Sequence, residues 1–268
     1  MVNLLHGDFM EKHVFKKKFG QNFLNDKSII NNITSSINPT EDDLIIEIGP
    51  GSGVLTKNLV KYNSNLICYE VDKDLETTLN QIKNDKTQII FDDFLKRDIQ
   101  SDISKIDYKN LYIIGNLPYY ITTPIILSII ESRVDVKEMV FMVQKEVAER
   151  FSAKPGSKEY GSISVLLNYY FDIKKLFDVS RTKFYPVPNV DSSVIKLVKK
   201  DNILSVDFEK FNKLVKDSFQ YKRKNIRNNL KSYDLNKVES VLTKYGYSLS
   251  SRSEELSYEI FVELANTI

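Results

Sequence analysis

Strand-like and helical segments alternate from residue 44 to about residue 151, and this alternation limits the possible folds more than any other feature. Short apolar runs with β character lie at 44–48, 66–71, 88–91, 110–114 and 138–143. Helical segments follow to about residue 61, around 74–84, from Thr123 and Pro124, and at 144–151. Such alternation is typical of βαβ units, which build a mostly parallel sheet flanked by helices. The nearly continuous apolar strands agree, because both faces of such a sheet are covered.

The last third of the chain has a different pattern. Two further β-like runs lie at 173–180 and 192–198, and from about residue 200 the pattern is helical throughout. We therefore predict an α/β domain over residues 1–199 and a small all-helical domain over 200–268.

Charge is spread unevenly along the chain. The 268 residues carry a formal net charge of only +2, but residues 210–237 hold nine Lys and Arg and two Asp. A local excess of this kind indicates a polyanionic partner, and a solvated helix face is the alternative interpretation.

Few residues in the sequence could serve as soft metal ligands or as nucleophiles. Cys68 is the only cysteine and stands in an apolar run, which favours a core position, and the histidines are His6 and His13. A zinc site, an internal disulfide and a Cys–His nucleophile are therefore not expected, and the single cysteine is consistent with a reducing compartment.

The apolar runs are too short to span a bilayer, and acidic residues come early in the chain, where a signal peptide would be apolar. We expect a cytoplasmic protein without a membrane partner.

The stretch "IIEIGPGSGVLT" (45–56) predicts a strand, a glycine turn and the start of a helix. Gly49 and Gly51 allow the backbone to approach a ligand closely, and the helix N-terminus offers free N–H groups. Glu70 follows the second strand, where an acid accepts hydrogen bonds from ribose hydroxyls. NAD and S-adenosylmethionine both suit this arrangement. Val54, in place of a third small residue, and Glu47 before the turn favour the methyl donor.

Two further strand ends carry polar or aromatic residues. Asp93 follows the third strand, at the edge where doubly wound sheets bind ligands, and its carboxylate can accept from an adenine amino group. The fourth strand ends in "GNLPYY" (115–120), which is either a plain turn or a site for a flat heteroaromatic ring. Together with the glycine turn, these features predict one ligand crevice.

Several motifs together resemble a known family. They are "KKFGQNFLND" (17–26), "EIGPGSGVLT", "YEVD" (69–72), "GNLPYY", "FMVQKEVAERF" (141–151), "FYPVPNVDSS" (184–193), "KRKNIRNNL" (222–230) and "RSEELSYEIF" (252–261). In this order they resemble the ribosomal RNA adenine N6-methyltransferases, and among them the small-subunit dimethyladenosine transferases of the KsgA/RsmA type. The resemblance runs from about residue 12 to 262. It implies a Rossmann-like class I methyltransferase fold with a seven-stranded sheet.

The resemblance also implies functional residues. Those expected to contact S-adenosylmethionine are Asn22, Leu24, Gly49, Glu70, Asp93 and Asn116. Those expected at the target base are Asn116, Pro118, Tyr119 and Phe184. Those expected to contact RNA phosphates are Lys222, Arg223, Lys224 and Arg227, with the Lys16–Lys18 run near the cofactor. No metal is expected. Tyr120 departs from the family, in which Asn is common at this place.

These residue types suit methyl transfer to an adenine amino group. The Asn116 side-chain carbonyl and the main-chain carbonyl of Leu117 or Pro118 can accept the two N6–H bonds and stabilise the growing positive charge. Tyr119 would stack on one face of the base and Phe184 on the other, each worth about 1–3 kcal/mol. Asn is not a base, so the proton leaves to water after transfer.

The reaction that the resemblance implies is dimethylation at N6 of two adjacent adenines in a hairpin loop near the 3′ end of 16S ribosomal RNA. The partner is then an immature small ribosomal subunit, and the protein is expected to be a monomer. Two alternatives stay open: a large-subunit methyltransferase of the macrolide-resistance type and a non-catalytic RNA-binding assembly factor. An NAD-dependent dehydrogenase ranks last, because no His or Lys is placed as an acid for hydride transfer.

Overall fold

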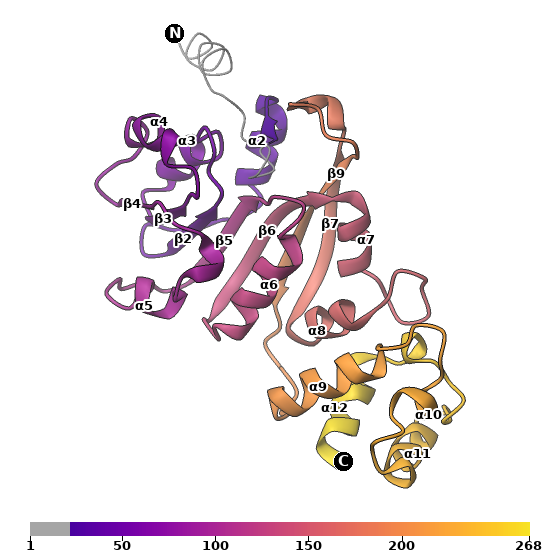
Figure 1. The fold of residues 1–268 in the computed structure, drawn as a ribbon. Helices are drawn as coiled ribbons and strands as arrows, with labels where there is room; N and C mark the ends of the chain where they lie inside the picture. Colours follow the sequence, from indigo (N-terminus) through magenta and orange to yellow (C-terminus); the bar gives the residue numbers. More distant parts are fainter. Residues whose placement is uncertain (1–21) are drawn as a thin grey trace. The chain divides into compact units, whose positions relative to one another are not determined.

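A computed structural model describes residues 22–268 of the chain (Figure 1). The strands are β1 (Phe23–Leu24), β2 (Leu44–Ile48), β3 (Asn65–Tyr69), β4 (Thr87–Ile90), β5 (Leu111–Asn116), β6 (Val136–Gln144), β7 (Phe171–Val179), β8 (Phe184–Tyr185) and β9 (Ser192–Lys199). The helices are α2 (Lys27–Thr34), α3 (Thr56–Leu59), α4 (Glu76–Asn80), α5 (Ile99–Ile103), α6 (Thr122–Glu131), α7 (Lys145–Phe151), α8 (Ser162–Tyr170), α9 (Phe208–Ser218), α10 (Ile226–Asn229), α11 (Leu235–Lys244) and α12 (Tyr258–Thr267). Short 3₁₀ turns lie at Val60–Tyr62, Lys73–Leu75, Phe94–Lys96, Arg181–Lys183 and Ser253–Glu255.

Seven strands form one sheet in the order β4-β3-β2-β5-β6-β9-β7 (Figure 1). The neighbours β2 and β3, β3 and β4, β2 and β5, and β5 and β6 pair in parallel. The chain first moves outward from β2 to β4 and then returns to the other side of β2 with β5. The order therefore reverses between β2 and β5, and in doubly wound sheets ligands bind at this point. The predicted mostly parallel sheet is confirmed.

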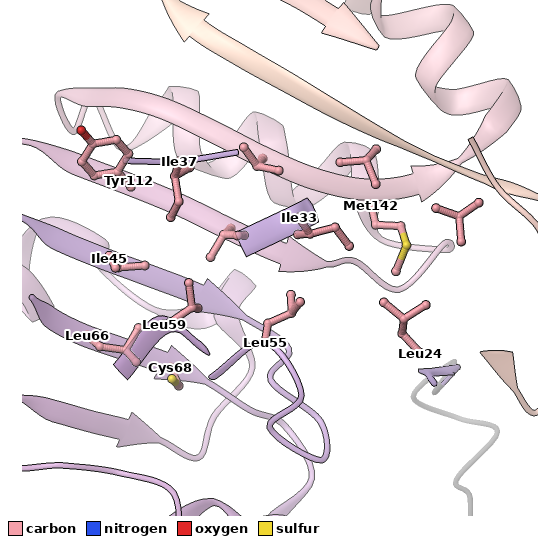
Figure 2. Close-up of a cluster of buried hydrophobic side chains, with 14 of the residues drawn as sticks. Leu24, Ile33, Ile37, Ile45, Leu55, Leu59, Leu66, Cys68, Tyr112 and Met142 are labelled. Atoms are coloured by element: carbon pink, nitrogen blue, oxygen red, sulfur yellow. The ribbon is translucent and has the colours of Figure 1, made fainter. Parts of the chain in front are cut away.

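A cluster of apolar side chains packs on one face of the sheet (Figure 2). Alternate strand residues such as Ile45 and Met142 point into it, because side chains along a strand alternate between the two faces. Ile33 of α2 and Leu59 of α3 cover them. The opposite alternate residues, including Ile46, are buried as well. Burial on both faces explains why the strands are apolar almost throughout.

A small two-stranded sheet joins distant parts of the chain. β1 pairs antiparallel with β8, with Phe23 opposite Tyr185 and Leu24 opposite Phe184. Asp26 then caps α2 by accepting hydrogen bonds from the backbone N–H groups of Ser28 and Ile29. The pairing of β1 with β8 was not expected from the sequence.

The chain forms two compact units. The first consists of the described part of Met1–Lys145 together with Leu176–Lys196, and the second of Glu146–Lys175 with Leu197–Ile268. Residues 200–268 contain helices and no strand, as the sequence pattern predicts. The division into domains at 199 and 200 stays a prediction, and the second unit takes in α8 as well.

Helix α8 is built into the second unit through an aromatic residue. The centroid of the Tyr169 ring lies 4.8 Å from the ring centroid of Phe211 in α9 and 6.3 Å from that of Tyr258 in α12. The Tyr169 hydroxyl donates to the backbone carbonyl of Leu204 at 2.7 Å. These contacts join α8, which precedes β7 in the sequence, to α9 and α12, which follow β9, in one helical core.

Candidate active site

A cavity of about 290 Å³ lies within the first unit. Its walls come from β1 and from the residues that follow β2, β3, β4 and β5, at the carboxyl ends of the central parallel strands. Eight residues singled out by the sequence line it: Asn22, Leu24, Gly49, Glu70, Asp93, Asn116, Pro118 and Tyr119. The fold thus brings together residues that are up to 97 positions apart in the sequence, at the predicted edge of the sheet.

The glycine turn forms the floor of this cavity beside β1. Gly49 and Gly51 have φ values of +71° and +57°, in the left-handed region that favours glycine. A Cβ atom on Gly51 would come within 3.0 Å of the Phe23 ring. The turn therefore passes directly against β1, and glycine is favoured there. Helix α3 begins at Thr56 and is four residues long, and a 3₁₀ turn follows it at Val60–Tyr62.

Glu70 braces the glycine turn. Its Oε2 accepts a hydrogen bond from the Gly51 backbone N–H, and its Oε1 accepts one from the Asp72 N–H, both at 2.9 Å. Only 5% of the residue is exposed, and this burial raises the pKa of Glu70 although the two N–H groups oppose the shift. The carboxylate therefore organises the turn in addition to the contact with a ribose that the sequence predicts.

Glu47 is the most deeply buried acid at the cavity. Its Oε2 accepts a hydrogen bond from the Thr56 hydroxyl at 2.7 Å and lies 3.6 Å from the Cys68 sulfur. Oε1 has no hydrogen-bond partner among the described residues. Burial raises the pKa of Glu47 from 4.5 to about 7. Cys68 is fully buried, as expected, and burial raises the pKa of its thiol.

Asp93 begins the 3₁₀ turn after β4. Its Oδ1 accepts a hydrogen bond from the Leu95 backbone N–H at 3.1 Å. The neighbouring Asp92 pairs with Arg97 across 3.4 Å. Both carboxylates line the cavity, so this wall offers hydrogen-bond acceptors to a ligand.

Asn116 ends β5, and its amide is held in one orientation. Its Nδ2 donates a hydrogen bond to the backbone carbonyl of Asn22 at 3.0 Å. The Pro118 carbonyl accepts bonds from the Ile121 N–H at 3.2 Å and from the Thr122 hydroxyl at 3.1 Å, and these begin α6. The strand end thus runs directly into a helix whose first turn is anchored on the motif.

Tyr119 is partly buried and fixed by its hydroxyl. The hydroxyl oxygen lies 2.7 Å from that of Ser192 at the start of β9, within hydrogen-bond distance. Burial raises the pKa of Tyr119, so the phenol stays neutral at physiological pH. Its ring is therefore held at the cavity wall and offers a flat apolar surface.

Three exposed apolar residues at the cavity were not named as site residues from the sequence, although Tyr120 belongs to the "GNLPYY" motif. Val71 is 42% exposed, Leu95 37% and Tyr120 60%, and all three line the cavity. Large apolar side chains with this exposure next to polar acceptors suit a planar ligand that is apolar on its faces. Their position directly after strands, beside Glu70, Asp93 and Tyr119, is the sequence feature that could have identified them.

Phe184 packs in the core cluster of the first unit. The residue is 3% exposed, belongs to the core cluster and pairs with Leu24 across the β1–β8 sheet. It is not among the residues that line the cavity. A role in stacking on the target base stays a prediction, and in this structure the ring supports β1.

The predicted phosphate contacts lie in the second unit. Lys222, Arg223, Lys224 and Arg227, together called the basic cluster below, are exposed on the turn before α10 and on α10 itself. The buried Asn229 holds this turn, because its Oδ1 accepts a hydrogen bond from the Tyr221 backbone N–H at 3.1 Å. The basic cluster is thus presented on a braced turn. The run Lys16–Lys18 and both histidines lie outside the described residues.

Neither a metal cluster nor a membrane span is found in the described chain. Among residues 22–268 no three His, Cys, Asp or Glu side chains group as metal ligands would. Nor does this part of the chain contain a helix with the length and apolar character needed to cross a membrane.

The strand order and the cavity at its reversal define a Rossmann-like fold of the class I methyltransferase type. The family model described as ribosomal RNA adenine dimethylase matches residues 12–268. The chain therefore belongs to the ribosomal RNA adenine dimethylase family, which confirms the resemblance inferred from the motifs.

Individual relatives agree with this membership. The ribosomal RNA small subunit methyltransferase A of Aster yellows witches'-broom phytoplasma is 41% identical over 257 residues, which cover 94% of this chain and 95% of the relative. The protein of the same name from Mycoplasma mobile is 42% identical over 251 residues, covering 93% and 96%. Among solved structures, a dimethyladenosine transferase from Plasmodium falciparum aligns with a TM-score of 0.75 at 24% identity, covering 90% of this chain and 95% of that one. At this identity the structural match shows the fold alone.

Proposed function

We propose that this protein transfers methyl groups from S-adenosylmethionine to N6 of two adjacent adenines in a hairpin loop near the 3′ end of 16S ribosomal RNA. One observation carries the proposal. Eight residues that the resemblance to the family singles out line one cavity at the carboxyl ends of the central strands. The names of the full-length relatives support the small subunit as the target.

The residues at the cavity fit the methyl donor. Glu70 and Asp93 offer carboxylate oxygens for the ribose hydroxyls and the adenine amino group, and Val71 and Leu95 offer apolar surface for the adenine ring. Gly49 leaves room for close approach of the ligand to the backbone. When bound, S-adenosylmethionine supplies a methyl group on a sulfonium, an electrophile that needs no metal.

The target adenine requires two acceptors for its amino hydrogens. The Asn116 Oδ1 is one of them. The Pro118 carbonyl already accepts two hydrogen bonds, which favours the Leu117 carbonyl as the other. Two acceptors draw the N6 lone pair out of conjugation with the ring and stabilise the positive charge that develops. Tyr119 stacks on the base, and the proton is released to water after transfer.

Recognition of the RNA falls to the basic cluster. Its four exposed cations suit phosphate contacts, which dominate recognition of structured RNA together with shape. We extend the proposal to a catalytic domain over 1–199, a recognition domain over 200–268, and a monomer that acts in the cytoplasm on the immature small subunit.

Mass mapping of methylated adenines in ribosomal RNA tests the proposal. Cells with and without this protein are compared, and a third strain carries only the Asn116→Ala variant. We expect dimethyladenosine in the small-subunit hairpin only with the wild-type protein. Methylation confined to large-subunit RNA would support the macrolide-resistance type of activity instead. Full methylation without the protein, or with the variant alone, contradicts the proposed role.

A further inference from the structure

The orientation of the Asn116 amide follows from the chemistry of its partner. The side chain faces the backbone carbonyl oxygen of Asn22, which can only accept hydrogen bonds. The atom 3.0 Å from that oxygen must therefore be the amide nitrogen. The two ends of a planar amide lie on opposite sides of Cγ, so the position of Nδ2 also determines where Oδ1 points.

The Asn22 carbonyl is itself held by the β1–β8 sheet. Immediately after Asn22, Phe23 pairs with Tyr185 and Leu24 with Phe184. Leu24 and Phe184 are 1% and 3% exposed, so both partners are anchored in the core cluster.

The pairing continues beyond the two-residue ladder. The Asn25 N–H donates to the Lys183 carbonyl at 2.9 Å, and the Lys183 ammonium lies 2.8 Å from an Asp26 carboxylate oxygen. Four consecutive residues after Asn22 are therefore tied to residues 183–185. The Asn22 carbonyl that faces Asn116 is therefore held in place by residues 23–26 and their partners at 183–185.

We propose that Asn22 is a positioning residue whose main-chain carbonyl, held by the β1–β8 sheet, keeps the Asn116 amide turned so that Oδ1 faces the adenine amino group. This inference rests on the proposed function, because it concerns the same adenine. An unrestrained amide can flip and present its NH₂ group, which donates and would repel an adenine NH₂ group. The hydrogen bond to Asn22 removes that orientation.

The variant Asn116→Asp separates this role from that of a simple acceptor. A carboxylate still accepts from N6–H, but it has no hydrogen to donate and its second oxygen would face the Asn22 carbonyl. A protonated carboxyl reproduces the amide, because its O–H donates to Asn22 and its C=O accepts from adenine. The variant should therefore work only in its protonated form.

The charged groups at the cavity strengthen this dependence on pH. The carboxyl groups that line it are Glu47, Glu70, Asp92 and Asp93, and the phenols are Tyr69, Tyr119 and Tyr120. Nearby carboxylates and the carbonyl dipole all disfavour a further negative charge, so the new carboxyl should have a raised pKa. Its protonated fraction then changes within the range in which the enzyme can be assayed.

The experiment measures methyl transfer by the wild type, Asn116→Asp and Asn116→Ala between about pH 5.5 and 8.5. The activity ratio of Asn116→Asp to the wild type should be on the order of 0.01 near the upper limit, as for loss of one oriented polar group. It should rise by up to about tenfold for each unit that the pH falls, following one protonation. The ratio for Asn116→Ala should stay low and flat. Division by the wild type removes the titration of Glu47 and Glu70, which all three proteins share.

A second measurement does not depend on activity. In urea unfolding, Asn116→Asp should lose stability relative to the wild type as the pH rises, because a raised pKa in the folded state stabilises only the protonated form. A flat activity ratio, or equal stability differences at low and high pH, would overturn the inference. The ratio can be measured on whichever RNA adenine the wild type methylates. Loss of the small-subunit target would therefore overturn the proposed function and leave this test intact.

Discussion

Replacing Glu70 by Gln tests whether the carboxylate organises the glycine turn. Both oxygens of Glu70 accept a backbone N–H at 2.9 Å, one from Gly51 and one from Asp72. A glutamine has a single acceptor oxygen, so in either orientation its NH₂ group faces one of these N–H donors. A buried hydrogen bond to a charged group is worth about 1.5–3 kcal/mol. The Glu70→Gln variant should lose up to about this much free energy of unfolding, because removal of the buried charge offsets part of the loss.

The same change should weaken binding of the methyl donor. If the Gly51 side is lost, the turn no longer holds its position against β1, and the cavity floor shifts. A loss of about 1.4–2.8 kcal/mol corresponds to a 10- to 100-fold weaker affinity. Calorimetry with S-adenosylmethionine and with S-adenosylhomocysteine measures the affinity, and urea unfolding measures the stability. Glu131→Gln is the matched control, because Glu131 is exposed at the end of α6.

Equal affinity and equal stability for Glu70→Gln and wild type would refute the reasoning. A loss of affinity without loss of stability would assign Glu70 to the ligand alone, in agreement with the ribose contact predicted from the sequence. The structure predicts that both quantities fall together, because the same two hydrogen bonds serve both.

Three further predictions follow from burial and charge. The pKa of Glu47 is raised from 4.5 to about 7, so its contribution to stability is present below about pH 4.5 and is lost as the pH rises to about 7. At about 1.4 kcal/mol for each pKa unit, the free energy of unfolding falls by about 3 kcal/mol over this range. Urea unfolding of Glu47→Gln should show a flatter dependence of the free energy of unfolding on pH. Phe184→Ala should lower the free energy of unfolding by about 3–5 kcal/mol and Phe184→Leu by much less, because the ring is buried in the core cluster. Slow methyl transfer by the stable Phe184→Leu variant would support the stacking role. Changing the whole basic cluster to Gln should weaken RNA binding and reduce the slope of log affinity against log salt by up to about 0.7–0.9 for each lost contact, with donor affinity unchanged. An unaltered slope would make the cluster a solvated surface and the Lys16–Lys18 run the next candidate.

The sheet could be predicted because its signals are local. Each of β2 to β6 is an apolar run followed by a turn or helix start, and the predicted runs differ from the observed strands by at most two residues at either end. The cavity residues were equally accessible, since the carboxyl ends of parallel strands meet at one edge. Glu70 and Asp93 were placed correctly at this edge by that rule alone.

Features that depend on distant parts of the chain could not be predicted. The β1–β8 sheet contains two residues in each strand, too few for any periodic pattern, and joins residues about 160 positions apart. The hydrogen bond from Asn116 to Asn22 uses a backbone carbonyl, which carries no sequence information. The burial of Phe184 goes with the β1–β8 pairing, in which it lies opposite the buried Leu24. Helix α8 was missed for another reason, because "SISVLLNYY" is mostly apolar and most of its residues are buried, so it shows no clear division into a polar and an apolar face.

The place of α8 in the second unit has a consequence for synthesis of the chain. Residues 146–175 leave the ribosome before the end of the first unit, yet α9 and α12, which contact Tyr169, are made last. During translation the face of α8 that carries Tyr169 therefore stays uncovered until residues 208–267 have emerged from the ribosome. A fragment ending at residue 199 would keep that face exposed permanently, and we expect it to aggregate where the full chain stays in solution. The C-terminal helices thus act within their own polypeptide as the cover for a helix made about 40 to 90 residues earlier.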